Sequence, residues 1–326
     1  MAELTRKELI MMLIGAGEQP RLAGLDLSSL SLTGLDLRAA SLSLTNLAGS
    51  DLRATNLTAA HLCEANLRKA TLTGANLAEA WLSGADLREA TLPWANLAGA
   101  DLSRADLSGA DLTGANLHGA NLSHALLIGA KLGRANLQGV DLSDAVLKGA
   151  TLSQSLLDEA DLSRADLQDA RLNGAGLVKA NLTASNLSRA DLSVADLSRA
   201  RLHMACLKST ILRRACLNKA VLTRATLTRA MLLNSSLRDA DLSESDLDGA
   251  DLTGCDLSGA ILNAARISPT QLNNASLSRA LINPLDPSDS RTHSRKPDES
   301  AVRTGLTYLV PKTDFSRKMI PGVTPA

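Results

Sequence analysis

The strongest pattern in the chain is a leucine at every fifth position. From Leu22 to Ile282 this spacing holds without a slip, with isoleucine only at Ile267 and Ile282. An α-helix repeats about every 3.6 residues and a β-strand about every two, so neither element produces a five-residue period. A fixed repeat over most of a chain is typical of a solenoid, whose units stack on one another and cannot fold alone.

One unit, Ala100 to Arg104, shows how the five positions divide. Side chains two residues apart in an extended segment point the same way, so Ala100 and Leu102 share the interior, as the small inner and the central position. Asp101 lies between them and points outward; we call its place the outward position. Ser103 and Arg104 occupy the first and second turn positions and lead the chain to the next side.

The motif Ala-(Asp/Asn)-Leu-x-x resembles the repeat of the pentapeptide-repeat family over about residues 22–282. The resemblance implies an all-β fold, a right-handed quadrilateral β-helix with four pentapeptides to a coil. Carried over to this chain, it implies about 13 coils and, at roughly 4.8 Å between stacked strands, a rod about 60 Å long. Residues twenty apart are then expected to lie directly over one another.

Residues 1–21 predict an N-terminal capping helix. Thr5 and Glu8 have the spacing of a capping box, and the helix is expected from about Arg6 to Ile14, with a stop at Gly15. Its apolar face is expected to cover the leucine-rich first coil, which would protect the end of the solenoid from aggregation. A helix lying on a membrane surface is the alternative. The side chains expected to meet are Leu9, Met12 and Leu13 on the helix and Leu25, Leu30 and Leu35 on the coil.

The repeat stops after Ile282, and residues 283–326 predict a flexible tail. Pro284, Pro287 and Pro297 punctuate a polar stretch at its start. Its last part is apolar again, and we interpret it as a C-terminal cap on the last coil or as a docking segment for a partner or a second copy. Nothing in the sequence closes this end as clearly as the N-terminal helix, so self-association into a homodimer through the C-terminal end is a further hypothesis.

The composition points to a narrow core and a cytoplasmic protein. Only 1% of the residues are aromatic, and the formal net charge is zero. No apolar run approaches the roughly 18 residues that span a bilayer, and no signal-peptide pattern precedes the repeats. The four cysteines show no CxxC spacing.

A basic band runs from Arg199 to Arg238, with nine Lys or Arg residues and no Asp or Glu. Its cations fall on all four expected sides and lack interleaved aromatics, which argues against a nucleic-acid groove. A solvated charged surface is the first interpretation and a site for an acidic partner the second. An acidic band from Asp239 to Asp256 follows; we expect it to attract the basic band along the rod, and steering of self-association is the alternative. The candidate partner-binding residues in the basic band are Arg201, Lys208, Ile211, Arg213, Arg214, Lys219, Arg224, Arg229 and Met231.

A small apolar patch is expected nearer the middle of the chain. Leu126 and Val146 both take the outward position and are twenty residues apart, with Ile128 alongside. Such patches are often contact points, although one this small is also consistent with neutral drift in a tolerant repeat.

The sequence offers no catalytic, metal or cofactor site. It lacks HExxH, P-loop and GxGxxG motifs. His61, Cys63 and Glu64 share one expected side, but no fourth ligand converges on them. The acidic residues are expected on a convex surface, where no pocket would shift their pKa values for acid–base catalysis. We therefore expect a protein that is not an enzyme.

Two functions remain. The first is a non-enzymatic protein-binding or scaffold solenoid of unidentified partner. The second comes from the resemblance, because some members of the family mimic DNA, bind DNA gyrase or topoisomerase IV and protect it from quinolones. Residues 22–282 hold 26 Asp or Glu and 24 Lys or Arg. A mimic of DNA should be strongly negative, and the repeat lacks the loops that interrupt such members, so the first function is favoured.

Overall fold

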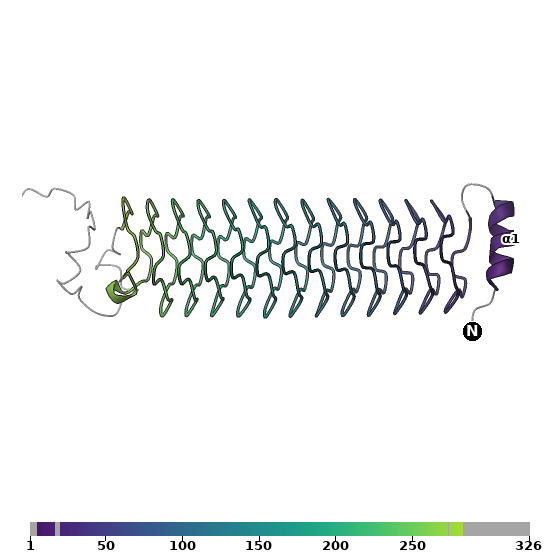
Figure 1. Cartoon of the computed structure of the whole chain (residues 1–326), viewed down its shortest axis with the longest axis horizontal. Coiled ribbons are helices and arrows are strands. Elements are labelled where there is room, and N and C mark those ends of the chain that lie inside the picture. The colour runs from purple at the N-terminus through teal and green to yellow at the C-terminus, as the bar shows by residue number, and fades with distance from the viewer. Residues whose placement is uncertain (1–4, 17–19, 273, 283–326) are drawn as a thin grey trace, which may run out of the picture.

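The computed structural model describes residues 5–16, 20–272 and 274–282, which form an elongated four-sided solenoid (Figure 1). Its two helices are α1, Arg6–Ala16, and the short 3₁₀ helix η1, Pro269–Leu272. The β structure of the described residues consists of single residues in parallel bridges, without longer strands. Each bridge joins residues 20 apart, from Arg21↔Ser41 to Ile261↔Leu281. The predicted stacking is therefore confirmed, whereas the predicted tail at 283–326 lies outside the described residues.

The four sides of the solenoid are numbered here by their outward residues. The first side carries residues 21, 41, 61 and onward, and the second carries 26, 46, 66 and onward. The third side carries 31, 51, 71 and onward, and the fourth carries 36, 56, 76 and onward.

Backbone hydrogen bonding explains why Asp and Asn dominate the outward position. Residues 102–106 have five backbone N–H groups, and four of them donate to backbone carbonyls. These bonds run from Leu102 to Asn121 (2.7 Å), Arg104 to Ser123 (3.0 Å), Ala105 to Leu102 (3.0 Å) and Asp106 to Ala85 (3.0 Å). The fifth, that of Ser103, donates to Oδ1 of Asp101 at 3.0 Å. A backbone N–H without a partner is costly, so an Asp or Asn at the outward position completes the hydrogen bonding of its unit.

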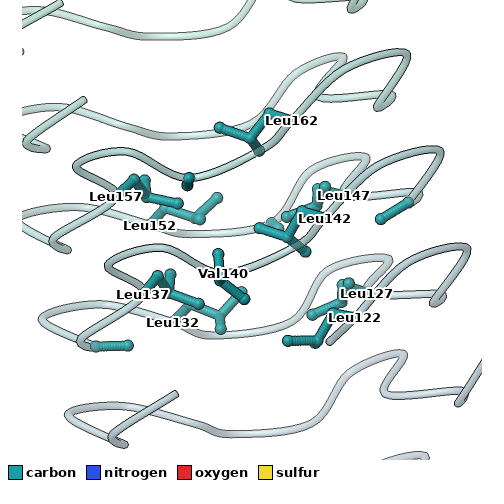
Figure 2. Packing of buried hydrophobic residues seen from close by; sticks show 14 of the residues in the cluster. Leu122, Leu127, Leu132, Leu137, Val140, Leu142, Leu147, Leu152, Leu157 and Leu162 are labelled. Atoms are coloured by element: carbon teal, nitrogen blue, oxygen red, sulfur yellow. The ribbon is translucent and has the colours of Figure 1, made fainter. Parts of the chain in front are cut away.

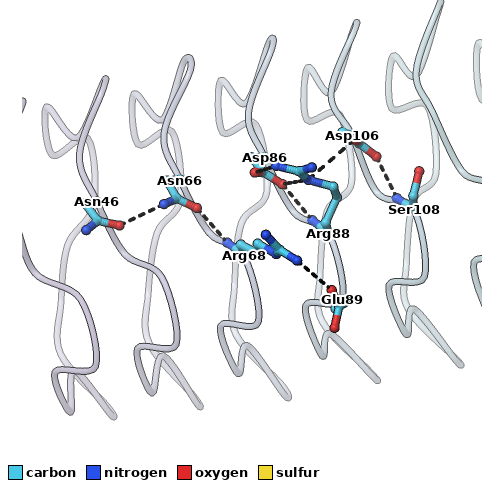
Figure 3. Close-up of polar contacts among 8 residues, drawn as sticks. All are labelled: Asn46, Asn66, Arg68, Asp86, Arg88, Glu89, Asp106 and Ser108. Carbon is cyan, nitrogen blue, oxygen red and sulfur yellow. Dashed lines mark hydrogen bonds and ion pairs between the residues drawn. The ribbon is translucent and has the colours of Figure 1, made fainter.

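The outward side chains also bond along the rod. On the second side, Nδ2 of Asn66 donates to Oδ1 of Asn46 at 2.9 Å, and the N–H of Arg68 donates to Oδ1 of Asn66 at 3.2 Å (Figure 3). On the fourth side, the amides of Asn96, Asn116 and Asn136 each donate to the Asn one coil earlier, all at 3.0 Å. The polar columns therefore support the backbone ladder from outside.

The second turn position has a positive φ in the repeats from Gly24 to Arg279, except at Pro269. This sign, with the hydrogen bond across the turn, is that of a type II β-turn and favours glycine or asparagine. Other L-residues pay roughly 1–2 kcal/mol there. Val194, with φ 61°, is the one β-branched side chain with a positive φ among the described residues.

The same requirement explains a break in the repeat near its C-terminal end. Pro269 falls at a second turn position, but the proline ring fixes φ near about −65°. The chain forms η1 instead, and within the described residues no bridge joins Asp251 to Gln271. The side-chain amide of Gln271 donates to the carbonyls of Leu247 (2.7 Å) and Ala250 (2.8 Å). The register resumes at the bridge Asp256↔Ser276, so the departure is local.

The core consists of leucine and alanine in successive layers. Figure 2 shows central residues such as Leu132, Leu137 and Leu152 pointing into the interior, with Val140 at a small inner position. Hydroxyl groups at small inner positions are also buried and bond to the backbone, as Thr45 does to the carbonyl of Leu22 at 2.9 Å. The buried leucines and alanines form one continuous core along the rod.

Helix α1 lies across the N-terminal end of the solenoid (Figure 1). The predicted capping box is present: the N–H of Thr5 donates to Oε2 of Glu8 at 2.7 Å, and the N–H of Glu8 donates to Oγ1 of Thr5 at 3.3 Å. The predicted stop at Gly15 is wrong, since the helix continues to Ala16. The prediction for Met12 is also wrong, since Met12 is 43% exposed. Among the described side chains of the helix, Leu9 and Leu13 are the ones that pack on the core.

Arg6 joins α1 to the first coil. Its Nη1 donates to the carbonyl of Ser31 at 2.6 Å and its Nη2 to that of Thr33 at 3.1 Å. In later coils, the corresponding carbonyls accept backbone N–H groups of the preceding coil, as those of Asp51 and Arg53 do from Leu32 and Gly34. The guanidinium of Arg6 thus takes the place of a missing coil.

The neighbours Leu126 and Leu127 test whether the central column carries the stability. Leu127 is fully buried, whereas Leu126 is 38% exposed. We expect Leu127→Ala to lower the free energy of unfolding by about 2–5 kcal/mol, because buried apolar groups are lost and a cavity remains in the core. Leu126→Ala should cost well under about 1 kcal/mol. Urea unfolding followed by circular dichroism, with hydrogen exchange of the flanking coils, measures both; equal losses would contradict the assignment of the core.

The turn at Val194 predicts a stabilising substitution. Val194→Asn should raise the free energy of unfolding by about 1 kcal/mol, because asparagine tolerates a positive φ far better than valine. The control is Ser193→Gly at the first turn position, which does not need a positive φ and should lose stability through the entropy of glycine. Thermal unfolding of both variants shows whether each change raises or lowers stability. A lower melting temperature for Val194→Asn would contradict backbone strain at Val194.

Candidate functional site

The basic band is exposed around the whole rod, on all four sides. Two of its cations meet the acidic band one coil later. Nε of Arg224 lies 2.8 Å from Oε2 of Glu244, and Arg238 bonds to Asp256. The bond to Glu244 raises the pKa of the Arg224 guanidinium. The expected attraction between the bands is thus present at these two pairs.

The remaining cations of the band have no ion pair within the described part of the chain. Elsewhere on the rod, turn residues pair across coils: Nε of Arg189 lies 2.7 Å from Oδ1 of Asp169, and Nη2 of Arg164 lies 2.6 Å from Oδ2 of Asp144. Hydrogen bonds from these arginines lower the pKa of each aspartate. The cations without such a carboxylate are Arg199, Arg201, Lys208, Arg213, Arg214, Lys219 and Arg229.

The two apolar residues predicted in the band are adjacent in the structure. Ile211 and Met231 bridge each other on the third side, and Met231 is 37% exposed. Nη2 of Arg213 lies 3.6 Å from Sδ of Met231. The structure therefore brings Ile211, Arg213 and Met231 together, next to Arg214, whereas Arg201, Lys208 and Arg229 lie on other sides.

The predicted patch at Leu126, Ile128 and Val146 lies on the second side. Leu126 and Val146 bridge each other, and Leu126 and Ile128 are exposed. This patch and the Ile211–Met231 pair occupy different sides and different coils, so the structure does not combine them into one surface.

Sequence reasoning missed several exposed apolar residues, among them Leu156 and Val194. Leu156 takes the outward position, and the same argument that found Leu126 could have found it. Val194 is 59% exposed and takes the second turn position of the third side, one coil before Arg214. Its signal in the sequence is a β-branched residue in a column of turn residues that otherwise avoids this type.

The histidine, cysteine and glutamate of the first side do not assemble a ligand set. The ring of His61 lies against that of Trp81, with 4.9 Å between centroids and 38° between the ring planes. In the part of the chain that the structure describes, no three His, Cys, Asp or Glu side chains gather as metal ligands. No helix among the described residues has the length and apolarity to cross a membrane.

Comparison with known proteins places the chain among repeat proteins. The profile of the family described as pentapeptide repeats matches in eight copies between residues 21 and 279. A search of curated proteins finds no match.

Several solved structures are similar. HetL, a pentapeptide repeat protein involved in heterocyst differentiation regulation from the cyanobacterium Nostoc sp. strain PCC 7120, is 32% identical over 80% of this chain and 98% of its own, with a TM-score of 0.25. Rfr23 from the cyanobacterium Cyanothece 51142 is 33% identical over 28% of this chain and 60% of its own, with a TM-score of 0.24. QnrB1, a plasmid-mediated fluoroquinolone resistance protein, is 18% identical over 65% of this chain and 85% of its own, with a TM-score of 0.34.

Pentapeptide repeat proteins form right-handed quadrilateral β-helices, in agreement with the four-sided register of 20 residues seen here. The eight matching copies agree with the leucine column and the Asx outward positions. The chain belongs to the pentapeptide-repeat family.

Proposed function

We propose that this protein is a non-enzymatic scaffold that binds other proteins through the outer surface of a rigid rod. On the 20-residue register the rod has about 13 coils, and α1 caps its N-terminal end. The observation that carries the proposal is the group of exposed cations in the basic band without carboxylate partners. Such cations are available to the carboxylates of another protein, which favours electrostatically guided association.

The distribution of chemistry supports binding over catalysis. The fully buried polar side chains among the described residues are serine and threonine, and all buried side-chain N and O atoms there have hydrogen-bond partners. The charged side chains stand on the outside of a convex rod. Acid–base catalysis depends on enclosed groups with shifted pKa values, whereas a rod of fixed spacing suits recognition.

The near balance of 26 acidic and 24 basic residues in the repeats does not favour a mimic of DNA. A supercoiling assay with DNA gyrase tests that alternative directly. Inhibition or quinolone protection at stoichiometric amounts of the rod would support it.

The scaffold proposal is tested by quantitative affinity capture with the full chain. The band variant changes Arg213, Arg214 and Lys219 to serine; Arg224 is left in place because it pairs with Glu244. The control changes Arg164, Lys179 and Arg189 to serine, which removes the same charge from cations that are already paired. Exposed ion pairs contribute little to stability, so both variants should fold.

We expect the band variant to lose a specific partner by about tenfold or more while the control retains it. Circular dichroism checks that the fold of both is unchanged. Capture of the same proteins by all three chains, or of none above background by the natural chain, would contradict binding through the band.

A further inference from the structure

Within the basic band, one side of the rod combines exposed and half-buried apolar side chains with arginines that form no ion pair within the described part of the chain. We call this group the 211 patch; it consists of Val194, Ile211, Arg213, Arg214, Met231 and Leu233. The apolar pair at its centre is continuous, because Ile211 and Met231 bridge each other. The neighbouring outward residues of the same side are Asp191 and Asp251, so the apolar step is confined to two coils.

The column of turn residues explains why Arg214 lacks a partner. Residues of this column on the third side run Gly174, Val194, Arg214, Asn234 and Gly254. No carboxylate lies one coil away in either direction, whereas Arg164 and Arg189 each find an aspartate one coil earlier. Stacking of the coils gives Arg164 and Arg189 an ion pair but leaves Arg214 exposed without one.

The guanidinium of Arg213 lies against the side chain of Met231. Its Nη2 lies 3.6 Å from Sδ of Met231, and no ion pair of Arg213 is present among the described residues. Hydrogen bonding from Thr253 lowers the pKa of Asp251, and the positive charge of Arg213 adds to this effect. The electrostatic field of Arg213 therefore reaches the neighbouring coils. The arginine is therefore positioned and still free to pair.

Val194 has a strained backbone conformation, and its exposed side chain does not pack in the core of the rod. It holds a β-branched side chain at φ 61° and is 59% exposed. Backbone strain of this kind tends to persist where a functional contact requires the side chain. One coil separates Val194 from Arg214 in the same column, so both are within reach of one molecule lying on the patch.

We infer that the 211 patch binds an acidic segment of a partner protein that also carries apolar side chains. Its apolar side chains pack on Ile211 and Met231, and its carboxylates pair with Arg213 and Arg214. The inference rests on the proposed scaffold function and names the chemistry of its partner. Charge complementarity selects an acidic occupant, and the apolar centre selects a protein over a nucleic acid, which would favour stacked aromatics and a longer cationic track.

Short labelled peptides test this chemistry with the full chain, by fluorescence anisotropy. The probe alternates glutamate and leucine; the comparison ligands are an all-glutamate peptide of equal charge and a short DNA duplex. We expect the glutamate–leucine peptide to bind at least about tenfold more tightly than either, and higher salt to weaken binding because exposed charges are screened.

Two pairs of variants separate the contributions. Arg213→Ser with Arg214→Ser removes the cations, and its control is Arg164→Ser with Arg189→Ser. Ile211→Ser with Met231→Ser removes the apolar pair, and its control is Leu156→Ser with Ile261→Ser, two apolar residues at outward positions of other sides. Serine already occupies outward and turn positions, as Ser41 and Ser209 do, so the rod tolerates it. Each patch variant should weaken the peptide about tenfold and each control less than about twofold.

Equal binding of the all-glutamate peptide or of DNA would overturn the inference, as would loss of binding in the controls to the same degree. Failure to bind any probe would overturn it too. These outcomes are distinct from failure of the scaffold function, because affinity capture through the remaining cations of the band can succeed while the 211 patch does not recognise acidic–apolar peptides.

Discussion

The structure depends on the hydrogen-bond ladder that joins outward residues 20 positions apart. The ladder and the turns satisfy four of five N–H groups in a unit such as that of Leu102, and an Asx side chain satisfies the fifth. Core, turn and surface positions follow from this: the leucine points inward because the ladder fixes the direction of each extended residue, and the second turn position needs a positive φ to reach the next side. Each short unit has little stability alone, so the stacking of neighbours is what makes it fold.

The same ladder divides the positions of each repeat into those that maintain the fold and those that are available for binding. A central leucine or a small inner residue is constrained by packing, as at Leu127 and Ala130, both fully buried. Outward and turn positions tolerate many residue types, because their side chains lie outside the closed core. Departures from the common pattern, such as Ile211 or Val194, are therefore informative, since the fold itself does not require them.

Much of this fold is predictable from the sequence, because a five-residue period with one residue type has few physical solutions. The stacking of residue 211 under 231 and the capping box at Thr5 follow from spacing alone. Other features depend on three-dimensional detail. Met12 is exposed because of the orientation of α1 on the coil, and η1 forms because Pro269 meets a turn that proline cannot adopt. The pairing of Arg224 but not Arg214 depends on which column each residue enters, and the sequence shows this only once the register is mapped.

Because each coil has four sides, the arrangement of the outer surface depends on how many pentapeptides precede each residue. Removing one pentapeptide would leave the leucine column intact, yet every later residue would move a quarter turn around the axis. Removing four pentapeptides, one register of 20 residues, would shorten the rod and return each side to its original direction. Lineages of such rods can therefore change length in whole coils with their surfaces preserved, whereas smaller changes in length rotate one half of the surface against the other.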